Sequence, residues 1–401
     1  DRTILDLHPD PAIMYEELKK AGSNLEEAYY KFLDYSRAQY NLIEEGYFNQ
    51  GLDTVAELLK YYGPQVFKLS FLTTMDRAVK KRLPNPYLRD IFDFFVKYVG
   101  SAATRAPGFM NLLPHIQFGY DLWYVKGGMY NLARGLERLL SELGVTINLN
   151  TEVTNITKVG SRVTGVETAV GHYPADWVVS NMEVIPAYKE LLHEKSGFLN
   201  KLKKFEPACS GLVIHLGVDR IYGNLAHHNF FYSANQREHF NSVFKKRELP
   251  ADPTLYVVAP SRTNPKVAPA EHDNLKILPH IPYLNEAHPY TRDDYMDLKD
   301  RVLQKLERMG LTDLRKHIVT EHVWTPHDIR RMYYSNGGSI YGVVSDIWKN
   351  YAFKAPKHSS KYDNLYFVGG STNPGGGMPM VTMSGQLVAE EIGQRANKSK
   401  D

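Results

Sequence analysis

Apolar residues recur at helical spacing through much of the first 120 residues of this chain. Residues 25–40, 55–59 and 87–99 carry them at the i, i+3, i+4 spacing of an amphipathic helix. A fourth segment, 106–120, has no acidic residue and no lysine and includes Phe109, Leu112 and Phe118. We expect this segment to be a buried helix, or alternatively the wall of an apolar tunnel or a surface in contact with lipid.

The pattern changes after Gly127. Residues 132–143 carry a leucine stripe at helical spacing, and Gly144 follows as a candidate C-cap. Val145, Ile147 and Leu149 then alternate with polar residues, which predicts a strand. Further strands are expected near residues 163–166, 177–179, 212–218, 255–259 and 276–281, and helices at 293–309, with Thr291 as N-cap, and after Thr325-Pro326.

Composition narrows the class of protein. The 401 residues are 43% hydrophobic and 23% charged, with a formal net charge of +3. This balance suits two or three globular domains, does not indicate nucleic-acid binding, and is compatible with an anionic membrane surface. The single cysteine, Cys209, excludes an intramolecular disulfide and favours a reducing compartment. We expect neither a transmembrane helix nor a signal peptide, because the longest uncharged run, 364–389, is rich in glycine.

The most informative segment lies near the C-terminal end. An apolar strand, 365–368, leads into Gly369-Gly370, then a loop, then a helix expected from Met380 to Ile392. Glycine permits close approach of the backbone to a ligand, and the free N–H groups of a helix N-terminus favour a phosphate or a polar ring edge. The alternative is a strand-to-helix crossover that binds no ligand.

Residues 364–381 resemble the C-terminal FAD-binding motif of the phytoene-desaturase and amine-oxidase superfamily. The resemblance implies that the glycine pair lies near the FAD pyrophosphate and ribityl chain, and that the following Gly-x-Pro-x-Val stretch runs beside the isoalloxazine. Ser371 stands where the broader amine-oxidase group has an acidic residue, which favours the carotenoid branch. The cofactor-binding residues implied here are Gly369, Gly370, Ser371, Gly377, Met378, Pro379, Met380 and Val381.

The resemblance extends through nearly the whole chain. It is carried by Glu45–Asn49, Lys97–Ser101, Leu122–Gly128, Ser180–Pro186, Leu225–Phe231, Leu278–Tyr283 and Gly310–His317. Asn373-Pro374-Gly375-Gly376-Gly377 is similar to the oxygenase branch, whereas the desaturase branch typically has His-Pro-Gly-Ala-Gly. The resemblance therefore implies oxidation of a terminal methyl group of a thirty-carbon carotenoid, with FAD as cofactor and dioxygen or a quinone-type compound as acceptor.

One part of the family pattern does not occur in this sequence. Such enzymes open with a Gly-x-Gly-x-x-Gly strand-turn-helix that binds the FAD pyrophosphate, and nothing here fits it. We therefore expect an N-terminally truncated chain. On the remaining nucleotide side, Val153 resembles the family position whose backbone contacts adenine.

The expected fold is α/β, with α+β mixed character, of the amine-oxidase and phytoene-desaturase type. We expect a helical lid that contacts membrane and substrate at 1–120, parts of a discontinuous FAD-binding domain at 121–190 and 326–401, and a mixed-sheet substrate domain at 191–325. Because carotenes partition into bilayers, we expect a cytoplasmic protein that is peripherally attached to the cell membrane.

The catalytic residues are not identified by the sequence. His115 and Lys97 are candidates, and the alternatives are a packed histidine and a solvated lysine whose stem packs on Phe94 and Phe95. No metal site is expected, because neighbouring histidines such as His227 and His228 point to opposite faces of a strand. A polyene desaturase, a flavin-dependent polyene isomerase and a non-catalytic module that binds apolar ligands remain alternative functions.

Overall fold

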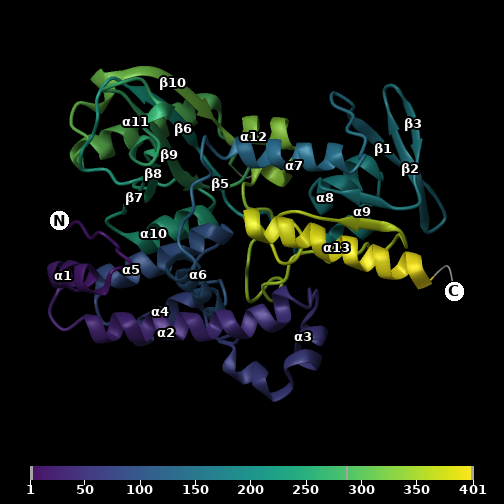
Figure 1. Cartoon of the computed structure of the whole chain (residues 1–401), viewed down its shortest axis with the longest axis horizontal. Coiled ribbons are helices and arrows are strands. Elements are labelled where there is room, and N and C mark those ends of the chain that lie inside the picture. The colour runs from purple at the N-terminus through teal and green to yellow at the C-terminus, as the bar shows by residue number, and fades with distance from the viewer. Residues whose placement is uncertain (1–2, 286–287, 399–401) are drawn as a thin grey trace.

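Helices form the first part of the chain in the computed structural model, which describes residues 3–285 and 288–398. They lie at the lower left of Figure 1, and the predicted helices at 25–40, 55–59 and 87–99 are confirmed. The bounds are α1 (Pro11–Ala21), α2 (Glu26–Ile43), η1 (Glu44–Phe48), α3 (Val55–Tyr62), η2 (Gly63–Lys68), α4 (Met75–Arg82), α5 (Pro86–Phe94), η3 (Phe95–Val99), η4 (Gly108–Leu112) and α6 (Leu113–Gly119), where η marks a 3-10 or π-helix.

Two hydrophobic cores hold these helices together. One joins α1, α2, α4 and α5 through residues such as Phe32, Leu83 and Phe92. The other gathers Ile43, Tyr47 and Phe109 with residues far along the chain. The segment 106–120 folds as η4 and α6. Phe109 and Leu112 are buried in these cores, whereas Leu113, Ile116 and Phe118 of α6 are half-buried, so the expected buried helix is confirmed only in the first half of the segment.

A six-stranded sheet follows, at the upper left of Figure 1. Its strand order is β10-β6-β9-β8-β7, with β5 paired to β9, and every pairing of described residues within this sheet is antiparallel, so the mixed sheet expected for this part of the chain is instead antiparallel. The bounds are β5 (Ser210–Gly211), β6 (Val213–Val218), β7 (His228–Phe231), β8 (Leu255–Val258), β9 (Asp273–Ile281) and β10 (Ile318–Trp324). Helix α11 (Arg292–Arg308) covers the sheet through Leu298, Val302 and Leu306.

The start signals read from the sequence are confirmed at two helices. The Thr291 side chain accepts from the Asp294 N–H and the Asp294 carboxylate accepts from the Thr291 N–H, which is a capping box. Thr325 and Asp328 form the same arrangement at α12 (Pro326–Tyr333). Each cap satisfies N–H groups that have no acceptor within the helix.

The third part of the fold holds the glycine-rich segment. Its bounds are α7 (Tyr130–Glu142), β1 (Val153–Val159), β2 (Arg162–Thr168), β3 (Gly171–Pro174), β4 (Val178–Ser180), α8 (Val184–Pro186), η5 (Ala187–Leu191), α9 (Ser196–Leu202), β11 (Leu365–Phe367) and α13 (Met378–Lys398). Strands β1, β2 and β3 form an antiparallel sheet, and β11 pairs in parallel with β4. The remaining short helices are α10 (Gln236–Asn241), η6 (Ser242–Lys246), η7 (Pro260–Arg262), η8 (Pro265–Val267), η9 (Leu314–His317) and η10 (Asn336–Gly338).

The strand predicted at Val145, Ile147 and Leu149 is wrong. These residues follow α7 as irregular, exposed chain, and no strand of the described residues pairs with them. An isolated extended segment gains no ladder hydrogen bonds, so alternation alone does not make a strand. None of the helices in the described part of the chain has both the length and the apolar composition needed to cross a bilayer.

Candidate functional site

The first half of the glycine-rich turn between β11 and α13 is packed on protein. The Gly369 N–H donates to Ser384 Oγ at 2.9 Å, and a Cβ at Gly369 would lie 2.7 Å from the Asn181 side-chain oxygen. Ser371 is buried, and its hydroxyl oxygen accepts from the Val184 N–H at 3.1 Å. The side chain of Ser371 is therefore occupied by the protein, and only main chain in this half is left for a ligand.

The second half of the turn is open. Gly377 has a φ of +102°, is exposed, and would place a Cβ in open space, since no heavy atom lies within 4 Å of that position. Met378 and Pro379 are also exposed, while Met380 and Val381 are half-buried. Because α13 begins at Met378, the N–H groups of its first turn have no acceptor within the helix. Main chain and helix N-terminus are therefore both accessible here, as a large anionic cofactor requires.

Asn373 ties the turn to the N-terminal helices. Its amide nitrogen donates to Asp53 Oδ1 at 3.0 Å, and its amide oxygen accepts from the Tyr47 hydroxyl at 2.6 Å. Asp53 also pairs with the Lys357 ammonium at 2.6 Å, and both side chains are largely buried. Neither Asp53 nor Lys357 was singled out from the sequence, because about 300 residues separate them from each other and no local pattern marks such a contact.

A second buried lysine, Lys354, packs against the turn. The Lys354 ammonium donates to the Val343 carbonyl and to Ser345 Oγ, and a Cβ at Gly375 would lie 3.3 Å from Lys354 Cε. Burial lowers the pKa of Lys354 to about 7. The backbone N–H of Lys354 donates to the Asn373 amide oxygen at 2.8 Å, so the lysine fixes the same point of the turn.

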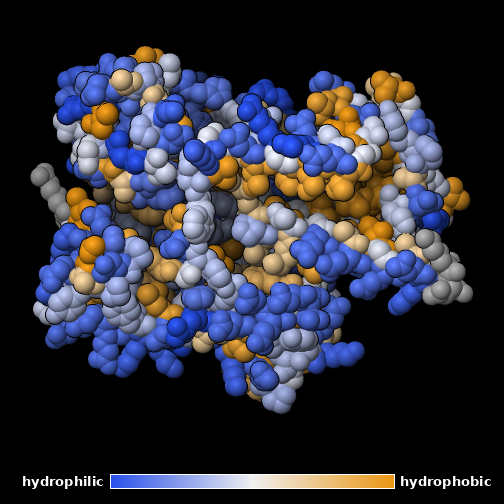
Figure 2. Space-filling model, in the orientation of Figure 1, coloured by the Kyte–Doolittle hydropathy of each residue, from blue (hydrophilic) through white to orange (hydrophobic). Residues whose placement is uncertain are grey.

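Helix α7 presents its apolar face to solvent, contrary to what a leucine stripe normally does. No residue of α7 is buried, and the leucines of the stripe are exposed: Leu132, Leu136, Leu139, Leu140 and Leu143. Figure 2 shows this apolar surface beside a hollow between α7 and α13, and the N-terminal end of α13 lies next to that hollow in Figure 1. An exposed apolar stripe of this extent is typical of a surface that binds a ligand or another layer of structure.

Lys97, a candidate catalytic residue, is buried rather than solvated. It is 6% exposed, and its ammonium lies 3.9 Å from the ring centroid of Tyr98 and 4.4 Å from that of Phe230. Burial lowers the pKa of Lys97 to about 7. The expectation of a solvated lysine is wrong because η3 turns this residue between α5 and the sheet rather than outwards.

Tyr341 connects the region of Lys97 with the turn. A Cβ at Gly376 would lie 3.1 Å from the Tyr341 carbonyl oxygen, whereas the Tyr341 hydroxyl lies 3.1 Å from His280 Nε2. Burial, together with the charges of His239 and Lys97, lowers the pKa of His280 to about 3. His280 and Tyr341 were not recognised as candidates in the sequence: His280 lies in Leu278–Tyr283, which carries the resemblance without assigning this histidine a role, and Tyr341 lies in a glycine- and serine-rich segment that matches no motif.

The other residues singled out from the sequence lie apart from the turn. His115 is half-buried on α6, where its ring lies 5.1 Å from that of Tyr40, and burial lowers its pKa. Val153 begins β1, in a different sheet from the turn. His227 and His228 do not point to opposite faces: their rings lie 4.4 Å apart, because His227 precedes the strand that begins at His228.

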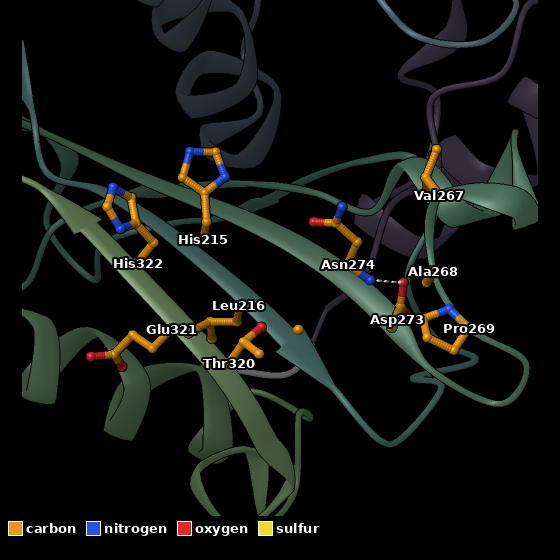
Figure 3. A pocket seen from close by; sticks show the side chains of 11 residues that line it. His215, Leu216, Val267, Ala268, Pro269, Asp273, Asn274, Thr320, Glu321 and His322 are labelled. Atoms are coloured by element: carbon orange, nitrogen blue, oxygen red, sulfur yellow. Dashed lines mark hydrogen bonds between the residues drawn. The ribbon is translucent and has the colours of Figure 1, made fainter.

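A separate depression lies on the antiparallel sheet. Figure 3 shows His215 of β6 beside His322 of β10, with Asn274 of β9 and Pro269 on the opposite side. Its lining mixes apolar and polar side chains, and the Asp273 carboxylate there accepts from the Asn274 N–H at 3.0 Å. Among the described residues no group of three or more His, Cys, Asp or Glu side chains is placed to bind a metal ion. None of the residues that line this depression belongs to the glycine-rich turn, so it is not part of the candidate site.

Comparison with known proteins points to one family. The family described as flavin containing amine oxidoreductase matches residues 48–393. The 4,4'-diapolycopene oxygenase of Methylomonas sp is 55% identical over 98% of this chain and 80% of its own length. The 4,4'-diaponeurosporene oxygenase of Staphylococcus aureus strain USA300 is 48% identical over 100% of this chain and 81% of its own length.

Solved structures agree on the fold. A putrescine oxidase variant with redesigned cofactor binding superposes with a TM-score of 0.60 at 12% identity, covering 92% of this chain and 76% of that one. An oxidoreductase from Methanosarcina mazei gives a TM-score of 0.53 at 14% identity, covering 90% of this chain and 75% of that one. At these identities the likeness confirms the expected fold and carries no argument about substrate.

Proposed function

The chain belongs to the flavin-containing amine oxidoreductase family, and from this premise we propose that it oxidises a terminal methyl group of a thirty-carbon carotenoid to an aldehyde. It is an FAD-dependent oxidoreductase. The proposed substrate class rests on the likeness, over nearly the whole chain, to two oxygenases named for 4,4'-diapocarotenoids. The Asn-Pro-Gly-Gly-Gly segment from Asn373 to Gly377 supports the oxygenase over the desaturase branch.

We propose that the accessible main chain from Gly377 to Met380 lies against the cofactor. The open position beside Gly377 and the free N–H groups at the start of α13 fit this role. The apolar stripe of α7 lies beside the hollow, where a bound cofactor would cover part of its exposed surface. FAD supplies the redox chemistry when bound, and the residues of this chain supply orientation and an apolar surrounding.

We assign the parts of the chain as the sequence predicts. Residues 1–120 contact membrane and substrate, 121–190 and 326–401 belong to the cofactor side, and 191–325 form the substrate domain. The separate core of the antiparallel sheet supports this division, while a core of the N-terminal helices also includes Phe353 and the β4–β11 core also includes Phe205, so the parts pack on one another at their borders. Val153 is proposed to contact the adenine end, and His115 to lie at the edge of the lid.

We also propose peripheral attachment to the cytoplasmic side of a membrane through residues 59–72, named here the 59–72 tip. Phe67 and Leu72 are 81% and 83% exposed, and the tip also exposes Leu59 and Tyr61. Lys60 and Lys68 lie exposed beside these apolar side chains, a combination that suits an anionic bilayer. The tip comprises the second half of α3, η2 and the residues up to Leu72, and α3 lies at the lower edge of the molecule in Figure 1.

Replacing Phe67 and Leu72 together with serine is expected to weaken binding to vesicles of phosphatidylglycerol and phosphatidylcholine by about tenfold or more. Fully burying one such side chain contributes roughly 1.5–3 kcal/mol. Co-sedimentation measures the bound fraction. Val170→Ser, at an exposed residue beside β3, is the matched control and should pellet like the unchanged protein. Equal pelleting of the double variant and the unchanged protein would exclude the tip as the membrane contact.

The proposed reaction is tested by the mass of the pigment. The FAD-loaded protein is supplied with a thirty-carbon polyene, and the product is expected to gain oxygen at a terminal methyl carbon when dioxygen is present. Loss of hydrogen without gain of oxygen, with a quinone as acceptor, would instead assign a desaturase. An unchanged mass with altered double-bond geometry would assign an isomerase, and an unchanged pigment a binding module.

A further inference from the structure

The Lys97 ammonium is buried without a partner of opposite charge. No hydrogen bond or ion pair of this group is found among the described residues, and it is surrounded by the rings of Phe94, Phe95, Tyr98 and Phe230, with centroids 3.9–5.8 Å away. Contacts with ring faces contribute about 2 kcal/mol at a desolvated site. They offset only part of the several kcal/mol that desolvation of a charge costs. The site therefore favours a ligand atom that accepts a hydrogen bond.

His239 is a second buried polar group in the same region. It is 2% exposed, and neither of its ring nitrogens has a hydrogen-bond partner among the described residues. The pKa of His280 is lowered by burial and by the charges of His239 and Lys97, so each of these two groups acts on His280. Phe94 lies among them: its ring centroid is 5.8 Å from the Lys97 ammonium, 5.9 Å from the His280 ring and 6.4 Å from the Phe240 ring, which in turn lies 5.5 Å from the His239 ring. Buried polar groups are normally satisfied, and two unsatisfied groups in one aromatic setting indicate a binding role.

This region adjoins the cofactor turn through Tyr341. The Tyr341 main chain supports Gly376, and its hydroxyl contacts His280. A Cβ at Gly100 would lie 2.6 Å from the Tyr341 ring, so the end of η3 that follows Lys97 packs on the same ring. The turn and the aromatic region around Lys97 therefore share the Tyr341 residue, whose main chain meets one and whose ring and hydroxyl meet the other.

The chemistry of the proposed substrate explains what a buried ammonium group could bind. A hydrocarbon end of a polyene has no hydrogen-bonding atom, whereas an aldehyde end carries a carbonyl oxygen that accepts hydrogen bonds. We propose that Lys97 is a specificity-determining residue whose ammonium binds the carbonyl oxygen of an oxidised polyene end, while the surrounding rings accommodate the conjugated chain. This inference rests on the proposed function and adds the residue that separates an oxidised end from an unoxidised one.

Lys97→Met tests the inference, because methionine keeps the length and apolar stem and removes the donor. The probes are crocetindial, a linear polyene with an aldehyde at each end, and lycopene, a polyene hydrocarbon, each supplied in detergent micelles to the full chain. Quenching of the protein's intrinsic fluorescence measures binding. The variant is expected to bind crocetindial about tenfold or more weakly, since a hydrogen bond to a charged group is involved, and lycopene within about twofold of the unchanged protein.

Lys276→Met is the matched control. Lys276 is also a lysine whose pKa burial lowers, but it lies on β9 facing the side of the sheet that carries Trp324. This variant should bind both probes like the unchanged protein. Crocetindial binding to Lys97→Met within twofold of the unchanged protein would overturn the inference and leave the proposed function standing. Failure of the unchanged protein to bind either polyene would overturn both.

A thermal melt shows whether the variant is folded. Removing an unpaired buried charge is expected to leave the protein as stable as before, or to raise its melting temperature. Lys97→Gln is the second variant, since it retains a neutral donor and should retain part of the affinity for crocetindial. Equal losses of crocetindial and lycopene affinity in both variants would identify Lys97 as a structural residue and overturn its specificity role.

Discussion

Asp53→Ala is expected to lower the free energy of unfolding by about 3–5 kcal/mol, because it leaves a buried lysine without its counter-charge. The Lys357 side chain is 5% exposed, and Asp53 accepts from it at 2.6 Å. Among the described residues the other partner of the ammonium is the Gly51 carbonyl oxygen at 2.8 Å, which carries no full charge. The same substitution removes the acceptor of the Asn373 amide and so loosens the turn that precedes α13.

Chemical denaturation followed by circular dichroism measures the loss of stability, and visible absorbance of the FAD-loaded protein measures cofactor retention. The control is Asp34→Ala, which breaks an ion pair with Arg37 whose two side chains are both exposed and should change stability by less than about 1 kcal/mol. The double variant Asp53→Ala, Lys357→Met should recover much of the loss, because no unpaired charge is left buried. Equal stability of Asp53→Ala and Asp34→Ala would show that this pair does not hold the turn.

Local patterns were sufficient to predict most secondary structure and two helix starts. Thr291 was recognised as a capping residue in front of a helical pattern, and Thr325 because a proline follows it at the first helical position. The strand expected near residues 163–166 is confirmed as β2, which pairs with β1 across a short turn. Such features depend on neighbours in the chain, so one sequence contains all the information needed.

Features that depend on distant partners could not be predicted in this way. The leucine stripe of α7 and the alternation at residues 145–149 have the patterns of buried elements, yet both are exposed because nothing in the described residues covers them. Lys97 has the spacing of a helix surface, but the sheet strand β7 packs against it through Phe230. Only tertiary packing decides which of two faces is buried.

In the candidate site, too, local features were predicted from the sequence and contacts between distant residues were not. The glycine-rich turn was found because its glycines and the following helix are contiguous, and Gly377 is accessible as expected. The residues that fix the turn, Asp53, Lys357 and Lys354, were not found, because lysines and aspartates give no local signal of burial. Tyr341 and His280 join the turn to the aromatic region across 61 residues of sequence.

Gly377→Val is expected to lower the affinity for FAD by about a hundredfold or more while the chain still folds. The substitution would place a branched side chain in the open space where we propose that the cofactor meets main chain. Displacing two main-chain hydrogen bonds of about 1.5 kcal/mol each is sufficient for this loss. The φ of +102° adds backbone strain of about 1–3 kcal/mol, which denaturation should detect separately from the loss of cofactor.

Gly160→Val separates strain from cofactor contact, since Gly160 also has a positive φ, +59°, and open space around its Cβ position. It lies in the turn between β1 and β2, far along the chain from residues 369–381, and its variant should lose less stability, because +59° falls in the left-handed helical region and +102° does not, and should retain FAD. Titration with FAD, followed by flavin fluorescence, gives the affinity of each variant. Because denaturation measures the strain of each variant separately, a loss of FAD affinity at Gly377 beyond its loss of stability is assigned to the space that its missing side chain leaves for a ligand. Retention of FAD by Gly377→Val with an affinity equal to that of Gly160→Val would therefore place the cofactor away from the start of α13.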